Sequence, residues 1–143
     1  MTSAIWAYGS QLQLGDGATP ENFTAIAELL ELTPPSESRD DIEVSNNSSA
    51  NGTREFIAGW RDPGEVEFKA NWLPTNATQD KTTGLRSVYN DNVNHNWKII
   101  LPSSILTISF AGHLSKLETE LPLEEQAQIS GTIKVSGAIT YSV

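Results

Sequence analysis

The feature that most constrains the fold is a strict alternation of apolar and polar residues near the C-terminus. Between Gln128 and Tyr141 the even-numbered positions are mostly polar, and the odd-numbered positions carry Ile129, Ile133, Val135, Ile139 and Tyr141. Successive side chains of a β-strand point to opposite faces, so this period of two predicts a strand with one buried face and one wet face. The chain is therefore expected to be built around a β-sheet.

The same alternation predicts further strands along the chain. Residues 65–72 place Val66, Phe68, Ala70 and Trp72 inward, and residues 105–114 place Leu106, Ile108 and Phe110 on one face. Residues 97–101 form a shorter apolar strand, and residues 4–14 are expected to form another, with Trp6 and Tyr8 as its anchors. Together these patterns predict a mainly β fold, a sandwich or partly closed barrel of two antiparallel sheets.

Helical signal is thinner. Residues 78–91 carry one narrow apolar stripe, formed by Leu85, Val88 and Tyr89, which predicts one flanking helix. Residues 23–32 also fit a helical face when judged by period alone. By contrast, residues 36–56 are rich in Ser, Asn and Asp, which predicts a long loop that leaves the core and returns.

Length and composition narrow the class of protein. A chain of 143 residues favours a single domain spanning residues 1–143, and the absence of cysteine rules out disulfides and thiolate metal sites. The formal charge of -9 disfavours a protein that grips nucleic acid, which needs Lys and Arg against the phosphates. No basic N-terminal region and no apolar run near about 20 residues is present, so we expect neither a signal peptide nor a membrane span.

The sequence holds no catalytic constellation. His95 lies in a polar stretch expected to be a solvated turn, and His113 is expected at a strand end facing solvent. Asp40, Asp41 and Glu43 lack the ligand spacing of a calcium loop, and the acidic run from Glu118 to Glu125 is expected to be a charged loop. We therefore expect no enzyme activity, no metal and no cofactor.

Several motifs occur in an order that is typical of one family. An Arg-Asp element at Arg39 and Asp40 leads into the polar loop, and a Gly-x-x-Asp-x-Gly turn at Gly59, Asp62 and Gly64 then opens the strand at residues 65–72. Near the C-terminus, residues 121–125 precede the alternating strand. This ordered set resembles the tail tube proteins of long-tailed bacteriophages with non-contractile tails.

The resemblance implies a fold and an assembly. It implies that residues 23–32 form strand rather than helix, and that six copies form rings which stack head to tail into a tube in the virion tail. Its partners would be further copies, a tape-measure protein, a tail tip initiator and a tail terminator, brought together in the host cytoplasm. Viral DNA would pass through the channel without specific binding, and no membrane would be involved.

The resemblance also suggests where the contacts lie. The residues expected to touch neighbouring subunits or rings are Arg39, Asp40, Asp41, Arg54, Glu55 and Trp60. Those expected to face the channel are Glu65, Glu67 and Lys69. Two alternatives stay open: a tube protein of a contractile injection or secretion system, and a small β-sandwich ligand-binding module whose aromatic platform would be Trp60 with Trp72.

Overall fold

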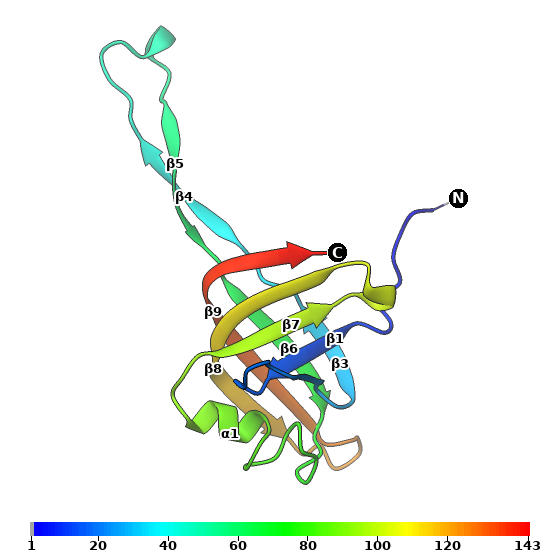
Figure 1. Cartoon of the computed structure of the whole chain (residues 1–143). Coiled ribbons are helices and arrows are strands. Elements are labelled where there is room, and N and C mark those ends of the chain that lie inside the picture. The colour runs from blue at the N-terminus through cyan, green and yellow to red at the C-terminus, as the bar shows by residue number, and fades with distance from the viewer. Residues whose placement is uncertain (1) are drawn as a thin grey trace.

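The computed structural model describes residues 2–143, and its main feature is one strongly bent antiparallel sheet (Figure 1). Seven strands form this sheet in the spatial order β2-β1-β7-β8-β9-β6-β3. Their bounds are β1 Gln11–Gly15, β2 Phe23–Ala25, β3 Leu29–Thr33, β6 Glu65–Asn71, β7 His95–Ile100, β8 Thr107–Glu120 and β9 Gln128–Ser142. The remaining strands, β4 Ser38–Glu43 and β5 Phe56–Asp62, pair only with each other. The mainly β prediction is confirmed.

The two longest strands give the sheet its bend. β8 and β9 pair along almost their whole length, with register shifts between Ser109 and Ala111 and between Leu114 and Lys116. A bulge inserts an extra residue on one strand and bends it there. Figure 1 shows β8 and β9 curving through the body, so that the sheet folds over on itself.

The two edges of the sheet meet at residues 26–28. The amide of Ile26 donates to the carbonyl of Leu12 in β1 at 2.8 Å, and the carbonyl of Glu28 accepts from the amide of Asn71 at 3.0 Å. Residues 23–32 are thus two short strands, as the family resemblance implied, and the helix suggested by their period is wrong. The chain turns between the two strands at Glu28, which has a positive φ of 51°. With only three residues, β2 is too short to show an alternation of apolar and polar side chains.

The core fills the inside of the bent sheet. Its buried residues include most of the inward positions predicted for β6, β8 and β9, and the largest fully buried side chain is that of Trp97. Trp72 and Leu106 pack against this core without being fully covered. The outer end of β9 departs from the predicted pattern: Gly137 has a positive φ of 86°, and beyond it Tyr141 is exposed.

Helix α1 (Leu85–Asn90) is shorter than predicted. Leu85 and Val88 are buried as expected, but residues 78–84 form turns rather than helix. The Asp80 carboxylate accepts backbone hydrogen bonds from Thr83 at 2.8 Å, Gly84 at 3.0 Å and Thr82 at 3.1 Å, which holds these residues in a turn. Two short 3₁₀ turns, Ala50–Gly52 and Pro102–Ser104, complete the regular elements. No helix within residues 2–143 is long and apolar enough to cross a membrane.

The N-terminal segment differs from its prediction. β1 begins at Gln11, so residues 4–10 belong to no strand, and Trp6 and Tyr8 are exposed rather than anchored. The two rings stack on each other with centroids 5.0 Å apart. Alternation alone missed this because a strand also needs a neighbour to pair with, and the pairing of β1 with β7 begins at Gln11.

Candidate assembly surfaces

The segment predicted as a long loop is a projecting β-hairpin. β4 and β5 leave the body together and end in a tip formed by residues 44–55 (Figure 1). Every residue of β4 is exposed, and so is every residue of β5 except the half-buried Gly59. The sequence prediction of an excursion was correct in position, but it missed the pairing because the charged residues of β4 hide any alternation.

The hairpin has two faces of different character. The register moves from Arg39 opposite Arg61 to Asp41 opposite Ala58, so β5 holds one extra residue at this bulge. Residues directly opposite share a face, and alternate residues of β4 point the same way. One face, the charged face, therefore carries Arg39, Asp41, Glu43 and Arg61, with Ala58 opposite Asp41 and Phe56 opposite Glu43. The other, the apolar face, carries Ile42, Val44 and Ile57.

Within residues 2–143 nothing covers the apolar face. Ile42 is 45% exposed and Ile57 is 54% exposed. Gly59 allows Ile42 to lie close over β5, since a Cβ at position 59 would meet the Ile42 side chain at 3.0 Å. A two-stranded ribbon with an open apolar face is marginal by itself in water, so this face needs a partner.

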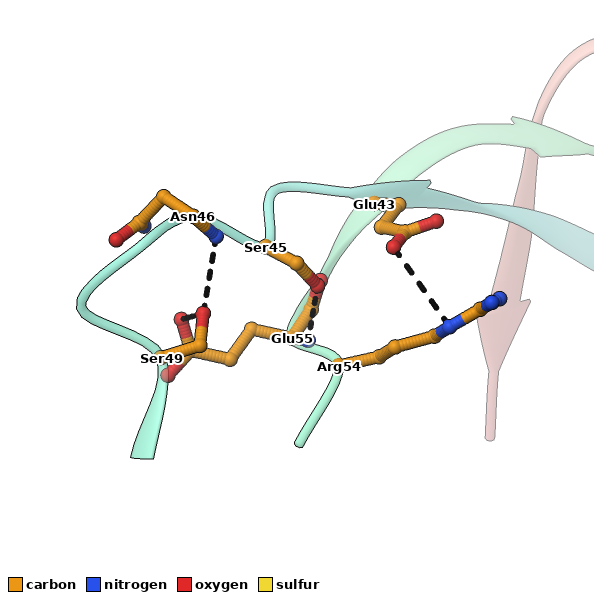
Figure 2. A network of polar contacts seen from close by, with 6 residues as sticks. All are labelled: Glu43, Ser45, Asn46, Ser49, Arg54 and Glu55. Atoms are coloured by element: carbon orange, nitrogen blue, oxygen red, sulfur yellow. Dashed lines mark hydrogen bonds and ion pairs between the residues drawn. The ribbon is translucent and has the colours of Figure 1, made fainter. Parts of the chain in front are cut away.

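The hairpin tip is held by a network of polar contacts (Figure 2). The amide of Glu55 donates to the Ser45 hydroxyl at 2.7 Å, and the Ser49 hydroxyl donates to the Glu55 carboxylate at 3.0 Å. The amide of Asn46 donates to the Ser49 hydroxyl at 3.0 Å. Arg54 approaches Glu43 at 4.0 Å on the exposed surface, a separation and setting at which an ion pair adds little.

The hairpin root, formed by residues 36–39 and 61–64 where the hairpin joins the body, is fixed by Asp62. Its carboxylate accepts the Gly64 amide at 2.8 Å and lies 3.3 Å from the Lys134 ammonium of β9. These contacts, first the Gly64 hydrogen bond and then Lys134, lower the pKa of Asp62. Gly64 has a φ of 78°, and a Cβ there would meet the Ser36 carbonyl oxygen at 2.0 Å. The turn spans Asp62 to Gly64 only, so Gly59 of the predicted motif lies inside β5 instead.

A second contact joins the root to the body. The Tyr141 hydroxyl of β9 donates to the Glu37 carboxylate at 2.9 Å. Partial desolvation, followed by the Glu37 hydrogen bond, raises the pKa of Tyr141. Sequence reasoning missed Lys134, Tyr141 and Glu37, because alternation predicts which strand residues are wet but not what they reach.

The three residues expected to face the channel share the outer face of β6. Glu65, Glu67 and Lys69 alternate with the buried Val66, Phe68 and Ala70, so they point away from the core. Their outward neighbours on β3, β9 and β8 follow from the strand register, and glutamates outnumber lysines among them. The charged residues of this outer face are Glu31, Glu65, Glu67, Glu118, Glu120, Lys69, Lys116 and Lys134.

Glu118 and Glu120 were expected in a loop and lie instead at the end of β8. Lys116 and Glu118 lie 3.4 Å apart. The loop prediction failed because the outward residues of this strand end are charged, while the inward Leu117 and Thr119 give only a faint alternation.

All the residues expected to contact neighbouring subunits lie on the projecting hairpin, namely Arg39, Asp40, Asp41, Arg54, Glu55 and Trp60. Trp60 is 85% exposed, so it is no core residue of this chain. Trp72 packs against the core, which removes the open aromatic pair on which the sugar-binding alternative depended.

The histidines form no catalytic or metal site. His95 lies in β7 rather than in a turn, and its Nε2 is 2.6 Å from the Asp91 carboxylate. The exposed His113 ring lies 3.2 Å from the Asn94 side-chain oxygen. Within residues 2–143 no group of three His, Asp or Glu side chains is placed to hold a metal ion.

Solved structures share this fold. A chain from the virion of a native gene transfer agent particle superposes with a TM-score of 0.76 at 16% identity, covering 98% of this chain and 100% of that one. A chain of the SPP1 tail tube gives a TM-score of 0.70 at 14% identity, with coverage of 96% and 78%. A chain from the extended sheath–tube complex of an extracellular contractile injection system, PVC, gives 0.74 at 13%, with coverage of 100% and 94%. No curated protein sequence matches the chain.

A family model gives the sharper result. The model described as lambda phage tail tube protein, TTP, matches residues 6–142. This range contains the bent sheet, the hairpin and its root, and it agrees with the family suggested by the ordered motifs. Because the match spans nearly the whole chain, the protein belongs to the lambda phage tail tube protein family.

Proposed function

We propose that copies of this chain form six-membered rings that stack head to tail into the tail tube, the channel through which the particle's DNA passes. As a member of its family, the chain is a structural protein of the virion tail. The observation that carries the proposal is the exposed hairpin, whose apolar face is left uncovered by the residues that the structure describes. Six-fold rings are consistent with a similar chain in the gene transfer agent tail, which has C6 symmetry.

Head-to-tail stacking explains why the hairpin is built to project. A contact between two different surfaces of identical subunits propagates as a filament. The hairpin supplies one such surface at one end of the body, and a neighbouring copy supplies the other. The charged hairpin residues Arg39, Asp40, Asp41, Arg54 and Glu55, together with Trp60, belong to this contact.

The outer face of β6 is proposed to line the channel. DNA carries about one negative charge per 1.7 Å of its axis, so a wall rich in lysine would retain it. The excess of glutamate over lysine around Glu65, Glu67 and Lys69 favours passage without binding. A cysteine at position 67 of assembled tubes should then react with a small maleimide but not with a bulky polymer-linked one. Equal reaction with both would place this face outside the tube.

The role is proposed to be structural, without enzyme activity. The partners proposed are a tape-measure protein, a tail tip initiator and a tail terminator. The second candidate is the tube of a contractile injection system, because a chain of such a system shares this fold. The family match favours the phage tail.

Electron microscopy with light scattering tests the proposal. Purified protein at high concentration, alone and with tail initiator and tape-measure proteins, is expected to form hollow tubes in at least one condition. Tubes that require the initiator support the phage tail, whereas tubes that form readily without it favour an injection or secretion system. A protein that stays monomeric in all conditions contradicts the proposal.

A further inference from the structure

Two arginines face each other at the root of the hairpin. Arg39 of β4 and Arg61 of β5 are directly opposite, on the charged face, and both are exposed. Like charges directly opposite destabilise a strand pair. Within residues 2–143 neither guanidinium forms an ion pair, although Asp41 lies on the same face. Three of the chain's four arginines lie in this hairpin, the third being Arg54.

The opposite end of the molecule carries the complementary chemistry. The turn between β8 and β9 reads Leu121-Pro122-Leu123-Glu124-Glu125 and directly follows Glu120. Its leucines are strongly exposed, Leu121 at 66% and Leu123 at 100%. Glu120, Glu124 and Glu125 form no ion pair within residues 2–143. Carboxylates match the forked donors of arginine, and exposed leucines beside them mark a contact surface.

Positions along β9 show that the arginine pair and the β8–β9 turn lie far apart in one copy. The β8–β9 turn immediately precedes Gln128, whereas the hairpin root meets β9 at Lys134 and Tyr141. At about 3.3 Å per residue, the first of these contacts is already about 20 Å along the strand. Figure 1 shows the hairpin leaving the body at the end opposite the β8–β9 turn. The arginines therefore cannot meet these glutamates within one chain, but they can between stacked chains.

We propose that the Arg39–Arg61 pair is the socket for the β8–β9 turn of the copy stacked in the next ring, with Glu124 and Glu125 as its acidic partners. The inference rests on the proposed tube function and names the contact that sets the stacking. The turn of the upper copy sits at the hairpin root of the lower copy, and the hairpin then runs along the body of the upper copy. There the upper copy covers the apolar face of the hairpin, which the described residues of its own chain leave exposed.

Charge reversal tests the assignment. The variants R39E/R61E and E124R/E125R should each slow tube elongation at least about ten-fold, because like charges would then face each other across the contact. The quadruple variant, which restores opposite charges across the contact, should recover most of the wild-type elongation rate. All four side chains are exposed, so each monomer should unfold at the wild-type temperature, which circular dichroism checks.

Each outcome is informative. If both double variants form tubes at the wild-type rate, the inference is overturned and the tube function still stands. Loss in both doubles without recovery in the quadruple variant overturns the pairing of these two surfaces. Failure of the wild-type protein to form tubes in any condition counts against the tube function itself.

A cross-link gives an independent readout, because the chain has no cysteine of its own. In assembled tubes, R61C/E124C should oxidise into covalent chains longer than six subunits, since each link joins one ring to the next. The matched control S38C/E124C places the thiol next to Arg39 in β4 but on the opposite face of the hairpin, and it should cross-link far less. Products that stop at six subunits would place the contact within a ring and overturn the inference, as would equal cross-linking by the control.

Discussion

The Lys134 ammonium of β9 lies 3.3 Å from the Asp62 carboxylate at the start of the turn into β6. This contact and the nearby hydrogen bond from Tyr141 to Glu37 link the sheet to the hairpin root through side chains. They fix the direction of the hairpin relative to β9, the strand that follows the β8–β9 turn.

Removing the lysine should therefore loosen the hairpin more than the fold. In Lys134→Gln we expect faster hydrogen exchange and lower backbone order parameters over β4 and β5, with little change in the unfolding midpoint. Lys69→Gln, on the same outer face but without a contact to the root, is the control. Unchanged hairpin dynamics in Lys134→Gln would show that the turn alone orients it.

Three aspartates make the stability of the fold depend on acid pH. Backbone hydrogen bonds, from Ala18 to Asp16, from Gly64 to Asp62 and from Thr83 to Asp80, lower their pKa values below that of an ordinary aspartate. A carboxyl with a lowered native pKa binds fewer protons when folded, so its stabilisation is complete above the unfolded pKa and is lost as pH falls through the native value. We expect the urea midpoint to fall steeply below about pH 4.

Asp80 offers the cleanest variant for that pH dependence, since its carboxylate holds the turn before α1. Asp80→Asn should be less stable at pH 7 and should lose less stability between pH 5 and pH 2. Glu124→Gln, which removes an exposed charge alone, serves as the reference. Parallel pH profiles for wild type and Asp80→Asn would contradict the assignment.

Gln79 is a buried polar side chain that links three segments. It is 2% exposed; its side-chain oxygen accepts the Leu73 amide at 2.8 Å, and its nitrogen donates to the carbonyls of Asn71 at 2.9 Å and Ala27 at 3.2 Å. Gln79→Ala leaves these backbone groups without a partner and should lower the free energy of unfolding by about 3 kcal/mol. The exposed Gln126→Ala should change it by less than about 0.5 kcal/mol. Equal effects in urea denaturation would refute this role.

The same substitution at two tryptophans should affect two different properties, monomer stability at Trp97 and tube growth at Trp60. Trp97 is fully buried and its indole nitrogen donates to the Gly112 carbonyl at 3.2 Å, so Trp97→Phe should destabilise the monomer by about 2 kcal/mol. Trp60→Phe should leave monomer stability unchanged within about 0.5 kcal/mol but slow tube growth. Thermal unfolding and elongation rates measure the two effects, and a Trp60 variant that assembles normally would remove it from the contact.

The strands were predictable where one face is dry and the other wet. Ile129, Ile133 and Val135 in β9, and Val66, Phe68 and Ala70 in β6, are buried as their alternation indicated. The pattern failed where burial does not separate the faces. β4 is exposed on both sides, so its pairing with β5 left no periodic trace.

Other errors came from local contacts that outweigh periodicity. Residues 78–91 fit a helix, but the Asp80 side chain accepts hydrogen bonds from three backbone amides, so the helix begins only at Leu85. The residues of the candidate surfaces likewise fall into those that local sequence motifs indicate and those that depend on distant contacts. The hairpin residues were found through the ordered family motifs, whereas Lys134 and Tyr141 depend on contacts between segments distant in sequence, which no local pattern encodes.

Helical reconstruction of the assembled tube by cryo-electron microscopy would show directly how the subunits are arranged. We expect stacked six-membered rings in which β4 and β5 cross from each ring to the next, with the outer face of β6 toward the channel. Rings whose hairpins point into solvent without touching another copy, or a protein that never forms rings even with initiator and tape-measure proteins present, would contradict it.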